Sequence, residues 1–316
     1  MGGVTAISYA RYEAPDLEVM EKFLVAFGLV RCLRTPTALY MRGTGARQYI
    51  HVTELAEQPR AVGLGFQVAE LADLEAIAAQ VDASVEHSTE PGGGARVVLR
   101  DPNGMRVDIH HGQQDASELP VRAPLVLNNS RSAPRSGVLQ RPAKGPSHVA
   151  RMEHAVFTGP NFDQALRFYQ DVLGMRISDR IHSGDGSENL VVFLHCGLGQ
   201  QFTDHHSLAL MRSPTVGMDH AAFVTLDWDD LMLGHEHLKQ TDYRHEWGVG
   251  RHILGSEVFD YWRDPFGNKV EHCTDGDMVN EDHEPGVAAI TDDILAIWSP
   301  PMADTFGEIS ERSRSC

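Results

Sequence analysis

The feature that most constrains the fold of this chain is a nine-residue segment that occurs twice. Arg100–Asp108 (RDPNGMRVD) recurs as Arg263–Glu271 (RDPFGNKVE). In each copy, Asp-Pro-x-Gly is typical of a type I turn, because proline fixes φ at the second position and glycine relieves the fourth. Strand-like runs flank both turns, at 95–100 and 105–110 and again at 256–263 and 268–273. The last hairpin of the first half is therefore predicted to reappear as the last hairpin of the second half.

A second repeated segment extends this symmetry. Residues 16–29 and 162–175 both show apolar positions at helical spacing and a glycine where a helix would end. A strand candidate precedes each of them, and each half then offers another strand followed by another helix. These further elements are expected at 6–12, 62–68, 71–81, 152–158, 219–225 and 228–240. The pattern predicts four modules, each a strand, a helix and several strands.

The modules divide the chain into two halves joined by a linker. We expect an N-terminal domain at 1–112 and a C-terminal domain at 150–276. Residues 113–149 are rich in Pro, Ser, Arg and Asn without periodicity, which predicts a linker partly packed on the surface. The proline-bearing residues 277–316 are interpreted as an irregular strap, either lying over a pocket or flexible.

Charge and composition exclude several classes of function. With 27 basic and 44 acidic residues the net charge is -17, whereas a nucleic-acid binder would show a basic surplus. No apolar run approaches the roughly 18 residues of a membrane span, and no secretory leader is visible at the N-terminus. The four cysteines are scattered without CxxC spacing, which favours a reducing, cytoplasmic location.

Three residues at matching places in the second half form a candidate metal site. His154 and His220 lie early in the first strands of the third and fourth modules, and Glu271 lies near the end of the last strand. Two imidazoles and one carboxylate on one face of a metal leave the opposite face open for substrate and O₂. The first half keeps a carboxylate, Asp108, but has no histidine near Ser8 or Leu64, so one metal per chain is expected.

The motifs around these residues resemble a known enzyme family. They are Met152–Phe157, His205–Leu210, Asp219–Phe223, Gly250–His252, Tyr261 and Val270–Glu271. Together they look like the type I extradiol ring-cleavage dioxygenases of the vicinal oxygen chelate superfamily. The resemblance implies an α+β fold of four βαβββ modules in two tandem domains, each an open mixed β-barrel flanked by helices. It also implies iron(II) or occasionally manganese(II), a catechol substrate, O₂, a semialdehyde product and a homo-oligomer.

The resemblance assigns roles to three further residues. His206 matches the acid–base histidine of the family, and His252 and Tyr261 match the pair that hydrogen-bonds the bound catecholate. His205 is expected to face the other way on its strand, as a surface residue or as a partner of the site. A register error of one residue would exchange His205 and His206.

Two departures from the family leave the substrate open. Trp247 stands where the homoprotocatechuate enzymes place an arginine, and Ile253-Leu254-Gly255 replaces the Thr-Asn-Asp of the biphenyl-type enzymes. Trp247 and Leu254 are expected to contact the substrate and to favour a hydrophobic ring substituent.

The remaining histidines and cysteines are expected to lie outside the chemistry. We expect solvent-facing or structural roles for His195, His235, His237, His245, His272 and His283, no metal at His110-His111, and buried packing for Cys196 and Cys273.

Three other activities within this architecture stay open. A nickel or zinc glyoxalase or an epimerase would use four ligands split between the halves. A ligand-sequestering module of the bleomycin-resistance kind would not need His206, His252 and Tyr261. An oxygenase resembling 4-hydroxyphenylpyruvate dioxygenase would share the two histidines and the glutamate but lack the His252–Tyr261 pair.

Overall fold

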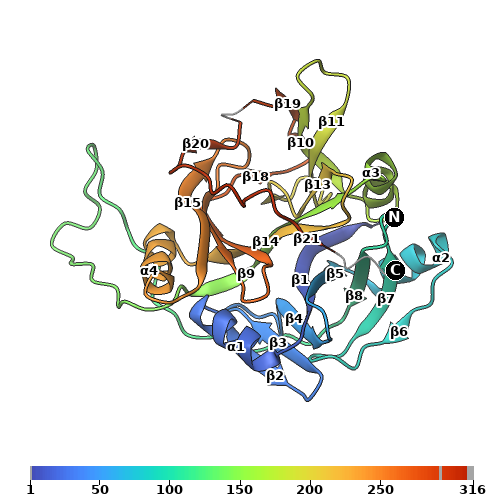
Figure 1. Cartoon of the computed structure of the whole chain (residues 1–316), viewed down its shortest axis with the longest axis horizontal. Helices are drawn as coiled ribbons and strands as arrows, with labels where there is room; N and C mark the ends of the chain where they lie inside the picture. Colours follow the sequence, from blue (N-terminus) through green and yellow to red (C-terminus); the bar gives the residue numbers. More distant parts are fainter. Residues whose placement is uncertain (1, 292–293, 312–316) are drawn as a thin grey trace.

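The computed structural model describes residues 2–291 and 294–311, and it has an α+β architecture of two large sheets flanked by helices (Figure 1). The first half contains β1 (Val4–Ala14), α1 (Leu17–Ala26), β2 (Val30–Arg34), β3 (Ala38–Arg42), β4 (His51–Leu55), β5 (Arg60–Val68), α2 (Leu71–Gln80), β6 (Glu86–His87), β7 (Ala95–Arg100) and β8 (Arg106–His111). The second half contains β9 (Val149–Gly159), α3 (Phe162–Asp171), β10 (Arg176–His182), β11 (Asn189–His195), β12 (Thr203–Asp204), β13 (Leu208–Arg212), β14 (Gly217–Thr225), α4 (Trp228–Leu238), β15 (Arg244–His252), β16 (Val258–Arg263) and β17 (Lys269–Thr274). The tail adds β18 (Met278–Val279), β19 (Gly286–Ala289), β20 (Ala296–Trp298) and β21 (Ser310–Glu311).

Each half is built from two βαβββ modules, as predicted. In each module the first strand pairs in parallel with the last, in β1–β4, β5–β8, β9–β13 and β14–β17. The two modules of a half meet through their first strands, which are antiparallel, in β1–β5 and β9–β14. The strand orders are β2-β3-β4-β1-β5-β8-β7-β6 and β19-β10-β11-β13-β9-β14-β17-β16-β15-β20. The centre of each sheet is therefore the junction between two modules.

The repeated turns and helix ends form as the sequence indicates. Gly104 donates its backbone N–H to the carbonyl of Asp101 at 2.8 Å, and Gly267 donates to Asp264 at 3.1 Å. Gly28 and Gly174 follow α1 and α3 with φ of 107° and 71°, a backbone conformation that glycine adopts without strain. These features fix where each helix ends and where each hairpin reverses.

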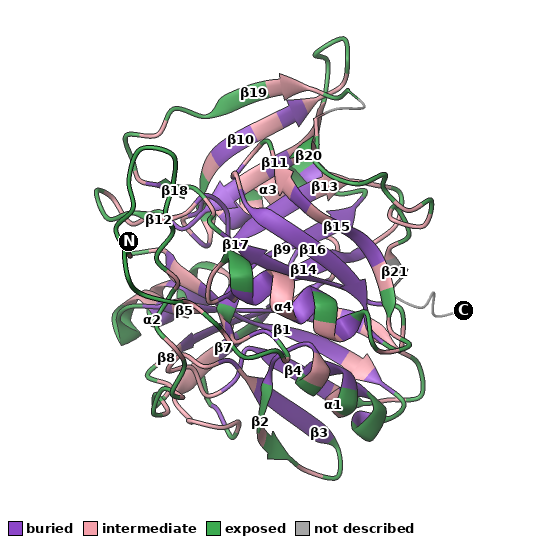
Figure 2. Ribbon diagram, turned by 90° about the vertical axis from the view of Figure 1, so that its left-hand side faces the viewer, coloured by how far each residue is buried: buried purple, intermediate pink, exposed green. Residues whose placement is uncertain are grey.

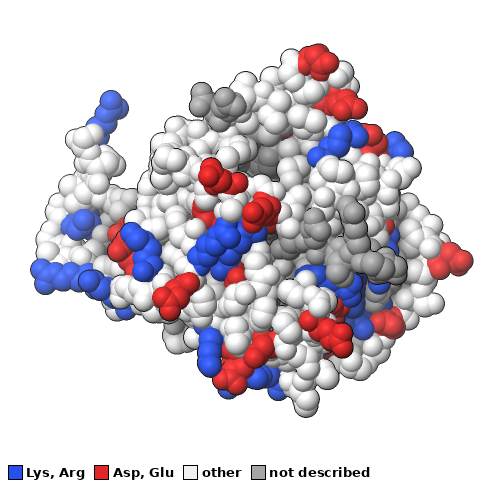
Figure 3. Space-filling model, viewed as in Figure 1, with Lys and Arg blue, Asp and Glu red and all other residues white. Residues whose placement is uncertain are grey.

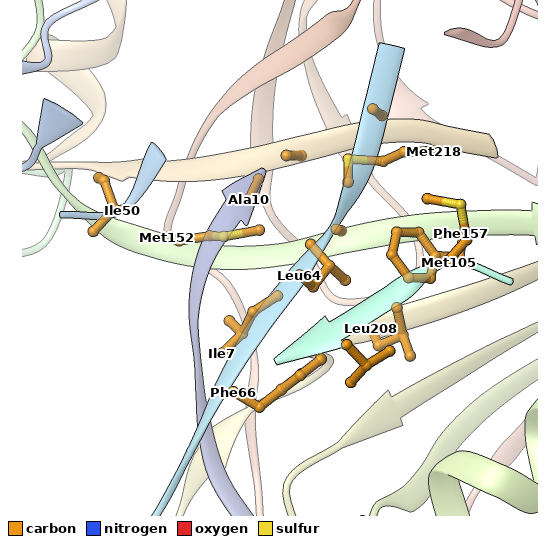
Figure 4. Close-up of a cluster of buried hydrophobic side chains, with 14 of the residues drawn as sticks. Ile7, Ala10, Ile50, Leu64, Phe66, Met105, Met152, Phe157, Leu208 and Met218 are labelled. Atoms are coloured by element: carbon orange, nitrogen blue, oxygen red, sulfur yellow. The ribbon is translucent and has the colours of Figure 1, made fainter. Parts of the chain in front are cut away.

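One continuous core joins the two halves. Ile7 and Phe66 from the first sheet belong to the same buried cluster as Met152, Phe157 and Met218 from the second (Figure 4). In Figure 2 the strands at this junction are buried, while the helices keep exposed residues on their outer sides. The halves are therefore packed on each other rather than merely tethered.

The linker is irregular, and two parts of it contact the start of α4. Residues 112–148 contain no helix or strand in the structure. This segment forms the long green loop beside α4 in Figure 1. Arg122 contacts both carboxylate oxygens of Asp227 at 2.6 and 2.7 Å, and the backbone N–H of His148 donates to Asp230. Strand β9 begins at Val149, the last residue of the predicted linker.

The tail is a strap that runs across the second half (red in Figure 1). Its short strands pair with four different elements: β18 with β12, β19 with β10, β20 with β15 and β21 with β14. The predicted strap at 277–316 includes residues 292–293 and 312–316, which lie outside the described residues. The irregular segment is thus attached to the second half by several short strand pairings.

The surface mixes charges of both signs. On the face drawn in Figure 3, acidic and basic side chains are interspersed among uncharged ones. Among the described residues, no helix is long and apolar enough to cross a lipid bilayer.

Candidate metal centre and its cavity

Strand register brings the predicted metal ligands together on one face of the second sheet. His154 on β9 and Glu271 on β17 both stand opposite Ala222 on the central strand β14. His220 precedes Ala222 by two residues and therefore shares its face. The Nε2 atoms of the two histidines are 3.4 Å apart, and each lies 3.3–3.4 Å from Oε2 of Glu271. The small side chain of Ala222 leaves the space between them free.

The surroundings of Glu271 fit a bound cation. Its side chain is fully buried, and neither carboxylate oxygen has a hydrogen-bond partner among the described residues. Ligand atoms at roughly 2.0–2.2 Å from one ion, at near right angles, lie about 3 Å from one another. The observed triangle of two nitrogens and one oxygen matches this spacing. A cation bound here would stabilise a buried carboxylate that accepts no hydrogen bond.

A carboxylate hydrogen-bonds His220, and another carboxylate lies near His154. Oδ2 of Asp219 lies 2.6 Å from Nδ1 of His220, and Glu153 lies 3.4 Å from Nδ1 of His154. Such partners leave Nε2 free for a metal. Burial raises the pKa of Asp219, but Lys269 and His220 outweigh it and hold that pKa at about 2. Strand alternation alone does not predict this arrangement, because an irregularity in β14 between Met218 and His220 turns Asp219 toward the site.

His205 and His206 lie in a bend rather than on a strand, which corrects the sequence-based expectation. The bend separates β12 from β13, and both side chains are buried. The two Nδ1 atoms are 3.1 Å apart, so His205 does not face the surface. The centroid of the His206 ring lies 4.0 Å from that of His154, with the rings tilted by 34°, and His206 lines the cavity. Burial, together with neighbouring histidines, lowers the pKa of His206 well below its usual range, so the ring is neutral.

His252 and Tyr261 form a hydrogen-bonded pair beside Glu271. Tyr261 stands opposite Glu271 in the register of β16 and β17, and its hydroxyl lies 2.9 Å from Nε2 of His252. Nδ1 of His252 lies 2.7 Å from the carbonyl oxygen of Leu295 in the strap, so Nδ1–H donates there and Nε2 accepts from Tyr261. Burial raises the pKa of Tyr261 well above its usual value, which keeps the phenol neutral.

Six of these side chains border one cavity of about 270 Å³: His154, His206, Asp219, His220, His252 and Tyr261. Trp247 and Leu254 line it, where the sequence placed them, and Trp247 donates its indole N–H to the carbonyl of Pro300 at 3.0 Å. The rest of the wall is largely apolar and consists of Val156, Ile181, Val191, Phe193, Ala209 and Met211. From the strap, Ile294, Leu295, Phe306 and Gly307 close one side. The strap therefore covers the cavity, the alternative that the sequence left undecided.

In the first half, side chains of the protein surround the carboxylate that corresponds to Glu271. Asp108 stands opposite Gly65 as Glu271 stands opposite Ala222, and Tyr9 takes the place of His154. Tyr9 is next to Ser8, near which the sequence offered no histidine. The Tyr9 hydroxyl donates to Asp108 at 2.9 Å, and Arg106 donates to it at 2.7 Å. A phenol and a guanidinium thus satisfy the carboxylate that would otherwise need a cation.

The other histidines have mostly structural partners, as expected. His235 and His245 lie 3.0 and 2.8 Å from Asp260, and His272 stacks on Phe27 at 3.7 Å. His195, His237 and His283 are buried or half-buried, and His110 bonds Ser8. Cys196 and Cys273 are fully buried.

Glu257 is a further buried group that the sequence motifs did not single out. It lines the cavity, and its Oε1 lies 3.5 Å from Nδ1 of His206. Glu257 precedes β16, which begins at Val258, so strand alternation does not predict the direction of its side chain. No sequence motif includes it either.

Comparisons with known proteins agree with this geometry. The model of the Glyoxalase/Bleomycin resistance protein/Dioxygenase superfamily matches residues 151–272. The chain is 32% identical to metapyrocatechase 2 of Cupriavidus necator over 309 residues, which is 96% of this chain and 91% of the relative. A Mn(II)-bound glyoxalase from Novosphingobium aromaticivorans superposes with a TM-score of 0.77 at 21% identity, covering 99% of both chains. A substrate complex of homoprotocatechuate 2,3-dioxygenase from Brevibacterium fuscum also gives 0.77 at 18% identity, covering 98% of this chain and 93% of that one.

Proposed function

We propose a reaction from one premise: this chain belongs to the type I extradiol dioxygenases, within the Glyoxalase/Bleomycin resistance protein/Dioxygenase superfamily. The proposed reaction is the cleavage of a catechol by O₂ at a carbon–carbon bond next to the diol. It would depend on iron(II), or alternatively manganese(II), and yield a ring-opened semialdehyde. His154, His220 and Glu271 would hold the metal.

The observation that carries the proposal is the buried Glu271 carboxylate. Neither of its oxygens has a hydrogen-bond partner among the described residues, and Oε2 lies 3.3–3.4 Å from two imidazole nitrogens. Asp108, at the same place in the first half, is instead satisfied by Tyr9 and Arg106. One half therefore supports a metal and the other does not. When bound, the ion would supply adjacent positions for a diol and O₂ and a path for electron density between them.

Three side chains would manage protons around the substrate. His206 is neutral and lines the cavity, so it can accept the proton of a substrate hydroxyl. Tyr261 is a neutral phenol that can turn from His252 to donate to a substrate oxygen. The bond to Leu295 keeps Nε2 of His252 unprotonated as an acceptor. The apolar wall and the strap exclude water from these groups.

The cavity favours a catechol with an apolar ring substituent. Trp247 is bound to the strap, and Leu254 and six apolar side chains complete the wall. A substrate carboxylate would lose its hydration there without a matching cation on the wall. At about 270 Å³ the cavity lies at the small end of ligand pockets. A single substituted ring suits that size.

A catechol panel with iron-loaded protein tests the proposal. Protein loaded anaerobically with Fe(II) is mixed with catechol, 3-methylcatechol, 4-ethylcatechol and 3,4-dihydroxyphenylacetate, and O₂ uptake and the yellow ring-fission product are followed. We expect turnover, with kcat/KM highest for the alkylcatechols. Absence of O₂ uptake with every catechol, in protein shown to contain iron, would refute the reaction. Preference for 3,4-dihydroxyphenylacetate would refute the substrate class alone.

A further inference from the structure

A chain of hydrogen bonds leads from His206 away from the cavity, and the proposed reaction does not yet use it. Nδ1 of His206 lies 3.1 Å from Nδ1 of His205. Nε2 of His205 lies 2.9 Å from Oδ2 of Asp179 on β10. Oδ1 of Asp179 accepts the backbone N–H of Gly286, on the strap strand β19, at 2.7 Å. His205 and Asp179 are both buried.

The carboxylate at the end of this chain determines where each proton lies. A carboxylate only accepts hydrogen bonds, so Nε2 of His205 carries the proton shared with Asp179. In a neutral imidazole the other nitrogen then has a lone pair, so Nδ1 of His205 accepts. The atom facing it, Nδ1 of His206, must donate. Nε2 of His206 is consequently the unprotonated nitrogen, on the ring that lines the cavity.

Glu257 is the one other carboxylate near Nδ1 of His206 among the described residues, and it does not compete for this proton. Its Oε1 is 3.5 Å away, against 3.1 Å for His205, and forms no hydrogen bond with His206. Burial, with the nearby charge of Glu153, raises the pKa of Glu257 well above its usual value. A neutral carboxyl group attracts the His206 proton less than an ionised one.

The geometry points to Asp179 and His205 as positioning residues that hold His206 in the tautomer required of a base. This inference rests on the proposed function, in which His206 accepts a proton from the catechol. In that step the substrate O–H bond breaks and an N–H bond forms at Nε2 of His206. The imidazolium keeps its Nδ1–H directed at His205, and Asp179 stabilises the positive charge through His205. No electron is transferred, and the proton returns to the product.

The substitution Asp179→Asn should reverse the direction of the hydrogen bonds from residue 179 to His206, while the side chain at position 179 keeps its shape. The amide oxygen still accepts from Gly286, but the amide NH₂ now donates to Nε2 of His205. His205 must then carry its proton on Nδ1 and donate to His206, which moves the His206 proton to Nε2. We expect kcat to fall about 10- to 100-fold, with KM for the catechol and iron content changed less than about twofold. Asp185→Asn, on the exposed turn after β10, is the matched control and should leave kcat unchanged.

A second substitution distinguishes positioning from a structural role. In His205→Asn the amide oxygen stands near the place of Nδ1 and can accept from His206 without help from Asp179. The double variant Asp179→Asn/His205→Asn should therefore recover most of the kcat lost in Asp179→Asn. If the double variant is slower than Asp179→Asn, the two residues only support the fold and the inference is wrong.

The tautomer can also be read without activity. The ¹⁵N shifts of the His206 ring, in protein labelled at histidine, loaded with diamagnetic Zn(II) and assigned by comparison with His206→Gln, report which nitrogen carries hydrogen. We expect hydrogen on Nδ1 in the unsubstituted protein and on Nε2 in Asp179→Asn. The same tautomer in both proteins overturns the inference. If the His206 tautomer changes as expected but no catechol is cleaved, the inference about Asp179 and His205 is supported and the proposed function is refuted.

Discussion

At the scale of single residues, the two halves treat the same buried carboxylate in opposite ways. Asp108 and Glu271 occupy matching places in their sheets, beside Gly65 and Ala222. Asp108 is neutralised within the protein, whereas the oxygens of Glu271 have no hydrogen-bond partner among the described residues. Substituting Asp108 and Glu271 in turn therefore distinguishes the contribution of a buried carboxylate to stability from its contribution to metal binding.

Glu271→Gln should abolish tight iron binding without unfolding the protein. The change removes one anionic ligand, so we expect iron content after desalting to fall at least about 10-fold. The thermal midpoint of the metal-free protein should fall only modestly, because the amide keeps the shape of the side chain while its contacts with His154 and His220 lose their charge. Metal analysis and calorimetry measure the two effects. Full iron content in this variant would exclude Glu271 as a ligand.

Asp108→Asn is the matched control and should behave in the opposite way. It leaves the buried Arg11 and the half-buried Arg106 with one anionic partner fewer. We expect the free energy of unfolding to fall by about 3 kcal/mol, in the range for a broken buried ion pair. Iron content per folded chain should stay unchanged.

At the scale of elements, the strap is a wall of the cavity. Phe306 lies 5.1 Å from the Tyr261 ring and 5.0 Å from Trp247, and Nζ of Lys269 lies 3.6 Å from its ring centroid. The same strap supplies the carbonyl of Leu295 to His252. A segment with little regular structure thus positions two aromatic groups and one histidine of the site.

Phe306→Ala should weaken the binding of alkylcatechols more than that of catechol itself. Removing the ring takes apolar surface from the cavity and admits water beside Tyr261. We expect KM for 4-ethylcatechol to rise about 10-fold, which corresponds to the roughly 1.5 kcal/mol of a partly buried aromatic side chain. Phe202→Ala, at an exposed phenylalanine outside the cavity, should change KM less than twofold. Equal KM values in both variants would show that the strap does not contact substrate.

The elements that were predictable from the sequence are those set by local rules. Proline and glycine fix the turns at Asp101 and Asp264, and helical spacing marks α1 and α3. The repeat marks His154 and Glu271 as candidates, but the register of β9 and β17 on β14 is what places them on one face. The irregularity in β14 that turns Asp219 inward is set by pairing with β9, which no local pattern encodes.

Two further features could not be predicted from the sequence. One is the bend at His205, and the other is the neutralisation of Asp108 by protein side chains in place of a metal. The sequence left His205 as a surface residue or a partner of the site, and the bend places it beside His206. The role of Arg106 and Tyr9 around Asp108 depends on contacts between distant strands. The covering of the cavity by the strap is likewise a long-range contact. Local propensity cannot specify such contacts, because they depend on the completed sheet.

At the scale of the whole molecule, the shared core makes the halves one unit. Phe27 of the first half stacks on His272 and contacts Phe223, and Tyr12 bonds the sulfur of Met218 at 3.4 Å. The backbone N–H of Val4 donates to the carbonyl of Leu173 at 2.8 Å. Separating the halves would expose this apolar junction to water.

We therefore expect a single cooperative unfolding transition. Calorimetry of the metal-free protein should give one peak, and fluorescence and circular dichroism should report the same midpoint in urea. Two resolved transitions would show that the halves are independent domains joined only by the linker. Met218→Ala, at the junction, should lower the midpoint without splitting the transition.

Buried histidine at the junction should make the protein sensitive to acid. His51 is buried beside Tyr12, with ring centroids 4.7 Å apart, and burial lowers its pKa to about 3. The unfolded chain binds that proton near pH 6.5, so the free energy of unfolding falls as pH drops from about 6.5 toward 3. His51→Phe should reduce the loss of stability between pH 7.5 and 5 by about 1–2 kcal/mol in urea titrations. An unchanged loss, equal to that of the exposed-site control His87→Phe, would contradict this.

The most direct test of the metal assignment is the stoichiometry of anaerobically reconstituted protein. Fe(II) is added, excess metal is removed, and iron per chain is measured before one catechol per iron and then O₂ are admitted. We expect one iron per chain in the unsubstituted protein, one O₂ consumed per catechol, and a ring-fission product. His220→Ala should bind no iron and consume no O₂. Iron retained by His220→Ala, or catechol unchanged in iron-loaded protein after O₂, would contradict the central claim.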